Sequence, residues 1–90
     1  MPTHESAEKR MRQNVKRRMR NKSVRTRLTT VARKFREQLE AGDLDAAAEQ
    51  IREVESTYDR AVSKGVIPRK RASRKVSRLK KSLSAAQAGE

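Results

Sequence analysis

The stretch VRTRLTTVARKFREQLEAGD (Val24–Asp43) contains an apolar stripe and the point at which the helix carrying that stripe ends. Its larger apolar side chains recur after 4, 3, 4 and 4 residues, at Val24, Leu28, Val31, Phe35 and Leu39. This spacing places them on one side of an α-helix. Gly42 suits the left-handed position that ends a helix, and Asp43 suits the N-cap of the next helix. The stretch therefore predicts a helix that packs through one face and then gives way to a second helix.

The preceding stretch, SAEKRMRQNVKRRMRNK (Ser6–Lys22), continues the same predicted helix but has almost nothing to bury. Its basic side chains point in nearly every direction, because about 3.6 residues make one turn. Met11, Val15 and Met19 form a stripe of their own, rotated by about half a turn from the later stripe. That stripe either packs against a neighbouring helix or stays uncovered. We expect the core to stop near Val24 and the first half of a helix over about residues 6–40 to project beyond it.

The start of this helix is predicted at Ser6, whose side chain suits the N-cap position. Glu8 then lies in the first turn, where a carboxylate favours the positive end of the helix dipole. Residues 1–5 are expected to form a loose lead-in. They include His4, the only histidine of the chain, and a single histidine cannot make a metal site.

A second amphipathic helix is predicted over about residues 43–63, with Asp45 in its first turn. Its apolar stripe consists of Leu44, Ala47, Ala48, Ile51, Val54, Tyr58, Ala61 and Val62. Glu49, Glu53 and Glu55 lie outside that stripe. Tyr58 fits the stripe as a core residue, the alternative being a ring that stacks on a nucleic-acid base.

A third helix is predicted over about residues 68–86. Gly65 ends the second helix, and Pro68 suits the first turn of the third, because the amide that proline lacks would be unpaired there. The stripe of the third helix is Ala72, Val76, Leu79, Leu83 and Ala86. Residues 84–90 are expected to fray. Three stripes joined by two short turns predict an all-α fold, an antiparallel three-helix bundle with a long protruding N-terminal helix, in one domain spanning residues 1–90.

Charge is high and unevenly distributed. The chain has 24 basic and 11 acidic residues and a net charge of +13. Residues 1–40 hold 13 basic and 4 acidic groups, residues 41–62 hold 2 and 6, and residues 63–90 hold 9 and 1. Only 33% of the residues are hydrophobic and 2% aromatic, so the core must be thin. We expect a marginally stable free protein that a polyanionic partner stabilises.

Several classes of function are excluded by what the sequence lacks. Without cysteine there is no disulfide framework or thiolate metal site, and no nucleophile is paired with a base. The three glycines form no phosphate loop. No apolar run approaches the roughly 20 residues of a spanning helix. We therefore expect a cytoplasmic protein that is not an enzyme and has no cofactor, metal, membrane partner or small-molecule substrate.

Phosphate binding is the positive signal in this sequence. Arginine matches pairs of phosphate oxygens and lysine adds point charge, while amides and hydroxyls can bond phosphate, sugar or base edges. The hydroxyl and amide candidates are Gln13, Asn14, Asn21, Ser23, Thr26 and Thr30. RNA is preferred to DNA because arginine-rich segments order on structured RNA and no helix-turn-helix or zipper pattern is present. A DNA-compacting protein and a lipid-surface helix are the alternatives, although the second needs a broad apolar face.

The order and content of four segments resemble the bacterial small-subunit ribosomal protein S20 family. They are SAEKRMRQNVKRRMRN (6–21), TRLTTVARKF (26–35), GDLDAA (42–47) and DRAVSKGVIPRKRASRKVSRL (59–79). The resemblance implies a three-helix bundle with a protruding first helix. It also implies a structural protein that binds small-subunit (16S) ribosomal RNA directly, supports subunit assembly beside other small-subunit components, and works in the cytoplasm as part of the ribosome.

The resemblance and the charge pattern together select one set of candidate RNA-binding residues. They are Lys9, Arg10, Arg12, Gln13, Lys16, Arg17, Arg18, Arg20, Asn21, Lys22, Arg25, Arg27, Lys34, Arg69, Lys70, Arg71, Arg74, Lys75 and Arg78. The chain departs from the family at Pro68, Arg69 and Lys70, where the family usually has His-Lys-Asn. Glu5 and Glu8 stand where lysine is common, so phosphate contact should be weaker at that end. The basic side of the third helix has a simpler alternative, a face that is merely solvated.

Overall fold

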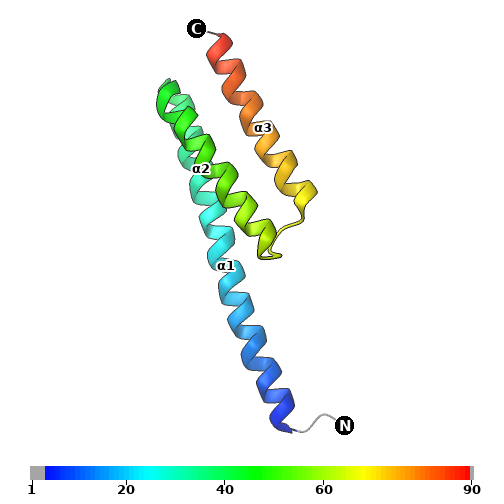
Figure 1. Ribbon diagram of the computed structural model, residues 1–90. Helices are drawn as coiled ribbons and strands as arrows, with labels where there is room; N and C mark the ends of the chain where they lie inside the picture. Colours follow the sequence, from blue (N-terminus) through cyan, green and yellow to red (C-terminus); the bar gives the residue numbers. More distant parts are fainter. Residues whose placement is uncertain (1–3, 90) are drawn as a thin grey trace.

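The computed structural model describes residues 4–89, and these form three α-helices without a strand. The helices are α1 (His4–Glu40), α2 (Leu44–Ser63) and α3 (Arg69–Ala88). Successive helices run in opposite directions, so the predicted antiparallel three-helix bundle is confirmed (Figure 1). α2 packs against both neighbours, whereas α1 and α3 contact each other only weakly.

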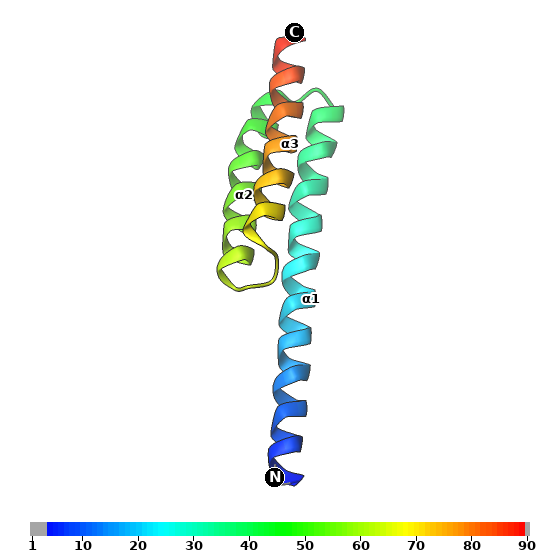
Figure 2. The same cartoon turned by 90° about the vertical axis from the view of Figure 1, so that its right-hand side faces the viewer.

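The bundle is elongated because α1 is much longer than its partners. Its 37 residues give a helix of roughly 55 Å. The described part of the chain measures 66 × 22 × 14 Å and has a radius of gyration of 17.9 Å, against about 12 Å for a compact protein of this length. Figure 2 shows α2 and α3 beside only the C-terminal half of α1. We call the uncovered part, residues 4–23, the rod.

Aliphatic side chains from all three helices form one core. Phe35 and Val54 are fully buried, and α3 contributes Val76, Leu79 and Leu83. Val24 and Leu39 pack at the two ends of the α1 stripe. Tyr58 is buried, which supports its assignment to the core rather than to a base-stacking position. Ala32 and Thr57 are also buried, although they were not assigned to the stripes; the Thr57 hydroxyl donates to the Glu53 carbonyl at 2.7 Å.

The apolar stripe of the rod is uncovered. Met11 and Met19 are each 68% exposed and Val15 is 51% exposed. No other helix of the described part lies beside the rod, because α2 and α3 accompany only the C-terminal half of α1. The core therefore stops near Val24, as predicted, and the alternative in which the stripe packs on a neighbouring helix is excluded within residues 4–89.

Both turns use the same glycine-based helix end. Gly42 and Gly65 have φ values of +78° and +74°. Amides beyond each helix return to its last carbonyls, from Asp43 to Gln38 at 3.0 Å and from Val66 to Ala61 at 3.0 Å. Since L-residues with a side chain rarely adopt positive φ, glycine is the residue that allows these reversals. The first turn leads directly into α2.

The predicted N-cap was right for α2 and wrong for α1. Asp43 is the N-cap of α2 and accepts a hydrogen bond from the Ala46 amide at 3.2 Å, with Asp45 in the first turn. Ser6 is not an N-cap, because α1 already includes His4 and Glu5; His4 Nε2 lies 3.3 Å from Glu8 Oε1, one turn later. The predicted loose lead-in is therefore wrong for residues 4 and 5, and residues 1–3 lie outside the described part.

The third helix is also shifted from its predicted bounds. Pro68 is its N-cap, one position before the predicted first turn. α3 continues to Ala88, so the predicted fraying from Ser84 is wrong as far as that residue. Leu83 is buried and Ala86 half-buried, so this end of α3 packs against the rest of the bundle. Alanine is also the strongest helix former, which favours helix in the last turns. Glu90 lies outside the described residues.

Candidate nucleic-acid interface

The rod presents basic side chains that have no partner within the described protein. Residues 4–20 are exposed throughout. The basic side chains from Lys9 to Arg20 form no ion pair with any residue in the range 4–89. α1 contains no acidic residue between Lys9 and Arg36. Positive charge along the rod is thus available to an external anion.

The candidate residues of α1 fall into rows along the helix. Spacings of three, four and seven residues keep side chains on one face. One row continues the direction of the core stripe and consists of Arg10, Arg17 and Asn21. A second lies beside it and consists of Lys9, Gln13, Lys16, Arg20, Arg27 and Lys34. A third consists of Arg18, Lys22 and Arg25, with Arg12 between the second and third.

Asn21 differs from the other candidates of the rod because it is half-buried. Its amide oxygen is inaccessible and accepts no hydrogen bond from residues 4–89. Two hydroxyl candidates are also less available than predicted. Thr26 donates to the Lys22 carbonyl and Thr30 to the Thr26 carbonyl, each at 2.9 Å. Within this geometry these hydroxyls can only accept, so they are not donors to phosphate.

Arg25 of α1 meets two candidates of α3 at a groove of about 400 Å³. Arg71 and Lys75 line the other side of this groove. Lys75 is half-buried, and burial lowers the pKa of its ammonium group, with a further lowering from the nearby charges of Arg36 and Arg78. The structure therefore brings together candidates that lie about fifty residues apart in the sequence.

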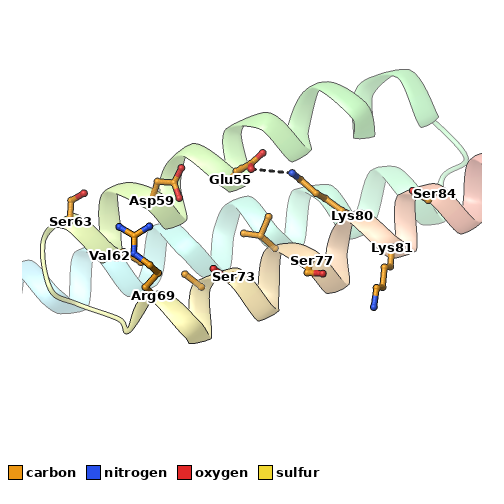
Figure 3. A pocket seen from close by; sticks show the side chains of 12 residues that line it. Glu55, Asp59, Val62, Ser63, Arg69, Ser73, Ser77, Lys80, Lys81 and Ser84 are labelled. Atoms are coloured by element: carbon orange, nitrogen blue, oxygen red, sulfur yellow. Dashed lines mark hydrogen bonds and ion pairs between the residues drawn. The ribbon is translucent and has the colours of Figure 1, made fainter.

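The remaining α3 candidates do not share one environment. Lys70, Arg74 and Arg78 are exposed. Arg69 instead lines a groove of about 670 Å³ between α2 and α3, on the same side as Asp59 (Figure 3). In that groove Lys80 Nζ lies 3.0 Å from Glu55 Oε1, the only ion pair between helices in the described part of the chain. Because the α2–α3 groove carries both signs of charge, it suits a polyanion less well than the rod does.

The described residues contain no grouping of His, Cys, Asp or Glu that could hold a metal ion. Among residues 4–89, no helix combines the length and the apolar character that crossing a bilayer demands. The geometry thus offers an extended, positively charged helix that projects from a small three-helix core, with the basic groove of Arg25, Arg71 and Lys75 beside that core. A family model described as ribosomal protein S20 matches residues 2–84.

The chain belongs to the ribosomal protein S20 family.

Relatives support this membership over nearly the whole length of the chain. The small ribosomal subunit protein bS20 of Rubrobacter xylanophilus is 50% identical over 76 residues, covering 84% of this chain and 90% of that protein. The protein of the same name from Desulfotalea psychrophila is 51% identical over 85 residues, covering 94% and 96%. That of a Mycobacterium species is 46% identical over 84 residues, covering 93% and 98%.

Membership of the S20 family confirms the resemblance seen in the sequence. Because the family is one of ribosomal proteins, this chain is a structural constituent of the ribosome and not an enzyme. Its location is therefore the ribosome in the cytoplasm.

The S20 bundle also gathers basic residues that sequence reasoning missed. Arg20 and Arg27 of α1 line a groove of about 360 Å³ together with Arg60 and Lys64 from the end of α2. Counting charge over residues 41–62 hid Arg60, because six acidic groups dominate that segment. Position could have revealed both, because Arg60 lies in the last turn of α2 and Lys64 is the C-cap of that helix.

Proposed function

We propose that this protein binds small-subunit (16S) ribosomal RNA directly and supports assembly of the small subunit, with the whole chain acting as a single RNA-binding helical domain. One observation carries the proposal: the rod projects beyond the core with every basic side chain from Lys9 to Arg20 exposed and unpaired within residues 4–89. Relatives named as small ribosomal subunit proteins support the choice of RNA. Other components of the subunit are its further partners.

Neutralisation is the mechanism. RNA helices that pack closely repel each other through their phosphates, and a polycationic rod between them lowers that repulsion. Basic rows on several sides of α1 allow the rod to contact phosphates from more than one RNA segment. Release of condensed counterions supplies much of the affinity, so the affinity must fall as salt rises. The exposed candidates Lys70, Arg74 and Arg78 of α3 make a second contact.

The three-helix core fixes where the rod begins and which way it points. Apolar contacts hold the C-terminal half of α1 against α2, so the rod continues as the same helix without a joint. A helix of α-helical geometry is stiff over this length, so phosphate contacts at its two ends are held at a set separation. This is how a core of few apolar residues can organise a much larger RNA surface.

The proposal is tested with a triple variant of the rod, Arg17→Ala, Arg18→Ala and Arg20→Ala. Alanine is the best helix former, so the rod keeps its helical propensity. We expect affinity for small-subunit ribosomal RNA to fall by about tenfold or more, and the slope of log affinity against log salt to decrease by about 3. Binding is measured by filter retention at several salt concentrations, with duplex DNA as competitor.

A matched control removes three exposed positive charges outside the candidate set, with Arg33→Ala, Arg52→Ala and Lys81→Ala. Both triple variants lose the same net charge, so a general electrostatic effect predicts equal losses. Equal salt slopes for the two variants, or duplex DNA competing as well as ribosomal RNA, would overturn the proposal. Far-UV circular dichroism checks that both variants keep the bundle.

A further inference from the structure

The open side of the bundle lies between α1 and α3. Both helices pack on α2, yet they touch each other only weakly. The C-terminal end of α3 extends past the turn that joins α1 and α2 (Figure 1, Figure 2). The groove of about 400 Å³ on this side is lined by Arg25, Leu28 and Thr29 of α1, Tyr58 of α2, and Ile67, Arg71 and Lys75. All three helices thus contribute to one groove.

The polar rim of this groove has a single sign of charge. Arg25, Arg71 and Lys75 form no ion pair with other residues of the described range. Neither facing helix offers an acid nearby: α1 has none between Lys9 and Arg36, and α3 has none at all. The α2–α3 side is different, because Glu55 neutralises Lys80 there. The α1–α3 side therefore has unrelieved like-charge repulsion, which an anion would remove.

A neutral donor completes the groove. Tyr58 is only 8% exposed, but it lines the groove, and its hydroxyl forms no hydrogen bond with any of residues 4–89. Among the described residues, the Tyr58 oxygen is not one of the inaccessible unpartnered atoms, so an external acceptor can reach it from the groove. The same hydroxyl lies near Arg36, whose charge acts on it. An anion seated between the helices would accept from Tyr58 while it neutralises the cations around it.

We propose that the α1–α3 groove binds one phosphate of the RNA backbone, and that this phosphate fastens α3 to α1. The proposal rests on the function proposed above and adds a defined site to it. Arginine forks from Arg25 and Arg71, the ammonium of Lys75 and the hydroxyl of Tyr58 supply donors from three helices around one tetrahedral anion. A backbone phosphate fits this arrangement because its two charged oxygens and two weaker ester oxygens are disposed tetrahedrally, so they can accept from donors that arrive from separate helices.

Two single variants test the site through RNA affinity and the salt dependence of that affinity. A residue that only stabilised the fold would not give the pattern of changes expected below. Lys75→Gln removes a charge and should lower RNA affinity while reducing the salt slope by about 1. Tyr58→Phe keeps the ring in the core and removes only the hydroxyl. It should lower RNA affinity by about threefold to tenfold without changing the salt slope, since no counterion is released by a neutral donor. Lys81→Gln, an exposed lysine of α3 outside this groove, is the matched control.

The outcomes separate this site from the general proposal. If wild-type protein binds ribosomal RNA with a steep salt dependence, but Lys75→Gln and Tyr58→Phe match Lys81→Gln, the groove is not a phosphate site while RNA binding stands. If wild-type protein itself fails to bind, the proposed function is wrong. Thermal unfolding of each free variant identifies any loss of affinity that comes from an unfolded bundle.

The fastening of α3 is tested by a distance measurement. The chain has no cysteine, so Glu40→Cys and Lys81→Cys give two unique labelling positions, one on α1 and one on α3. We expect RNA to narrow and shorten the distribution of distances between spin labels at these positions. In the Tyr58→Phe and Lys75→Gln backgrounds the RNA-bound distribution should stay broad. A distribution that RNA leaves unchanged would overturn the fastening.

Discussion

Gln50 of α2 donates a hydrogen bond from its side-chain Nε2 to the backbone carbonyl of Val31 in α1, over 3.2 Å. It is the one side-chain hydrogen bond that joins these two helices within residues 4–89. The contacts around it are apolar, including Ala47 and Val54, which are fully buried. Apolar contact is tolerant of sliding, whereas a hydrogen bond needs one alignment. The Gln50–Val31 pair therefore adds a directional contact that favours one register of α2 along α1.

Replacing Gln50 by leucine should lower the free energy of unfolding by about 1 kcal/mol, because the hydrogen bond to Val31 is lost. The matched change is Gln38→Leu. Gln38 is half-buried, and its amide oxygen is inaccessible and unpartnered among residues 4–89. Removing an unsatisfied polar group should leave stability unchanged or raise it. Urea unfolding followed by circular dichroism measures both, and a loss of the same size in both variants would contradict this assignment.

Truncating Leu28 to alanine should destabilise the protein by about 2–5 kcal/mol, since it leaves a cavity in a small core. Truncating Met19 to alanine should change stability by less than about 0.5 kcal/mol, because that side chain is exposed. The two residues lie nine positions apart on one helix, so the comparison locates the end of the core. Thermal unfolding of the free protein is the measurement. A Met19→Ala variant as unstable as Leu28→Ala would mean that the rod is packed.

Changing Lys16 to glutamate should make the free rod more helical and bind RNA less well. Arg12, Lys16 and Arg20 are spaced by four residues, so like charges face each other twice on one side of the helix. Glutamate at position 16 turns both repulsions into attractions. At about 0.2–0.5 kcal/mol for each repulsion removed and each attraction gained, the helix is stabilised by about 1–2 kcal/mol. Circular dichroism and salt-dependent RNA binding measure the two effects. If both moved in the same direction, helicity rather than charge would control binding.

The single tyrosine allows a clean test of burial by pH. Burial raises the pKa of Tyr58 above its ordinary value of 10.0, and the charge of Arg36 opposes this to a smaller extent. The folded state then holds the phenolic proton more tightly than the unfolded state does. This contribution to stability is complete below pH 10.0 and is lost as pH rises through the folded-state pKa. Tyrosinate absorbance should therefore give a midpoint above 10.0 for folded protein and a lower one in denaturant.

Ionisation of Lys75 changes the stability of the protein in the opposite direction over the same pH range. Its folded-state pKa lies below 10.5, so the folded protein releases this proton more readily than the unfolded chain. Stability therefore rises as pH increases from the lowered pKa toward 10.5, and Lys75→Gln removes that rise. In this variant the alkaline loss of stability caused by Tyr58 should begin earlier and be steeper. Unfolding free energies measured between pH 8 and 11 would show an unchanged profile if the two groups were not perturbed.

Periodicity and turn chemistry in the sequence were sufficient for the architecture. The stripe from Val24 to Leu39 and the Gly42–Asp43 stop signal depend only on neighbours a few residues away, and both appear as predicted. The projection of the rod also followed from local spacing, because the rotation between two stripes is a property of one helix. Helix ends were less predictable: Ser6 and Pro68 are each one or more positions from their expected roles.

The tertiary structure alone decided which basic residues share a site. Sequence pattern placed Arg25, Arg71 and Lys75 on their own helices, but only the packing of α1 and α3 against α2 brings them to one groove with Tyr58. It likewise joined Arg60 and Lys64 to Arg20 and Arg27. The physical reason is the range of the interactions concerned. Helical periodicity and capping act within a turn or two of the chain, whereas charges meet across helices whose orientation the buried apolar contacts determine.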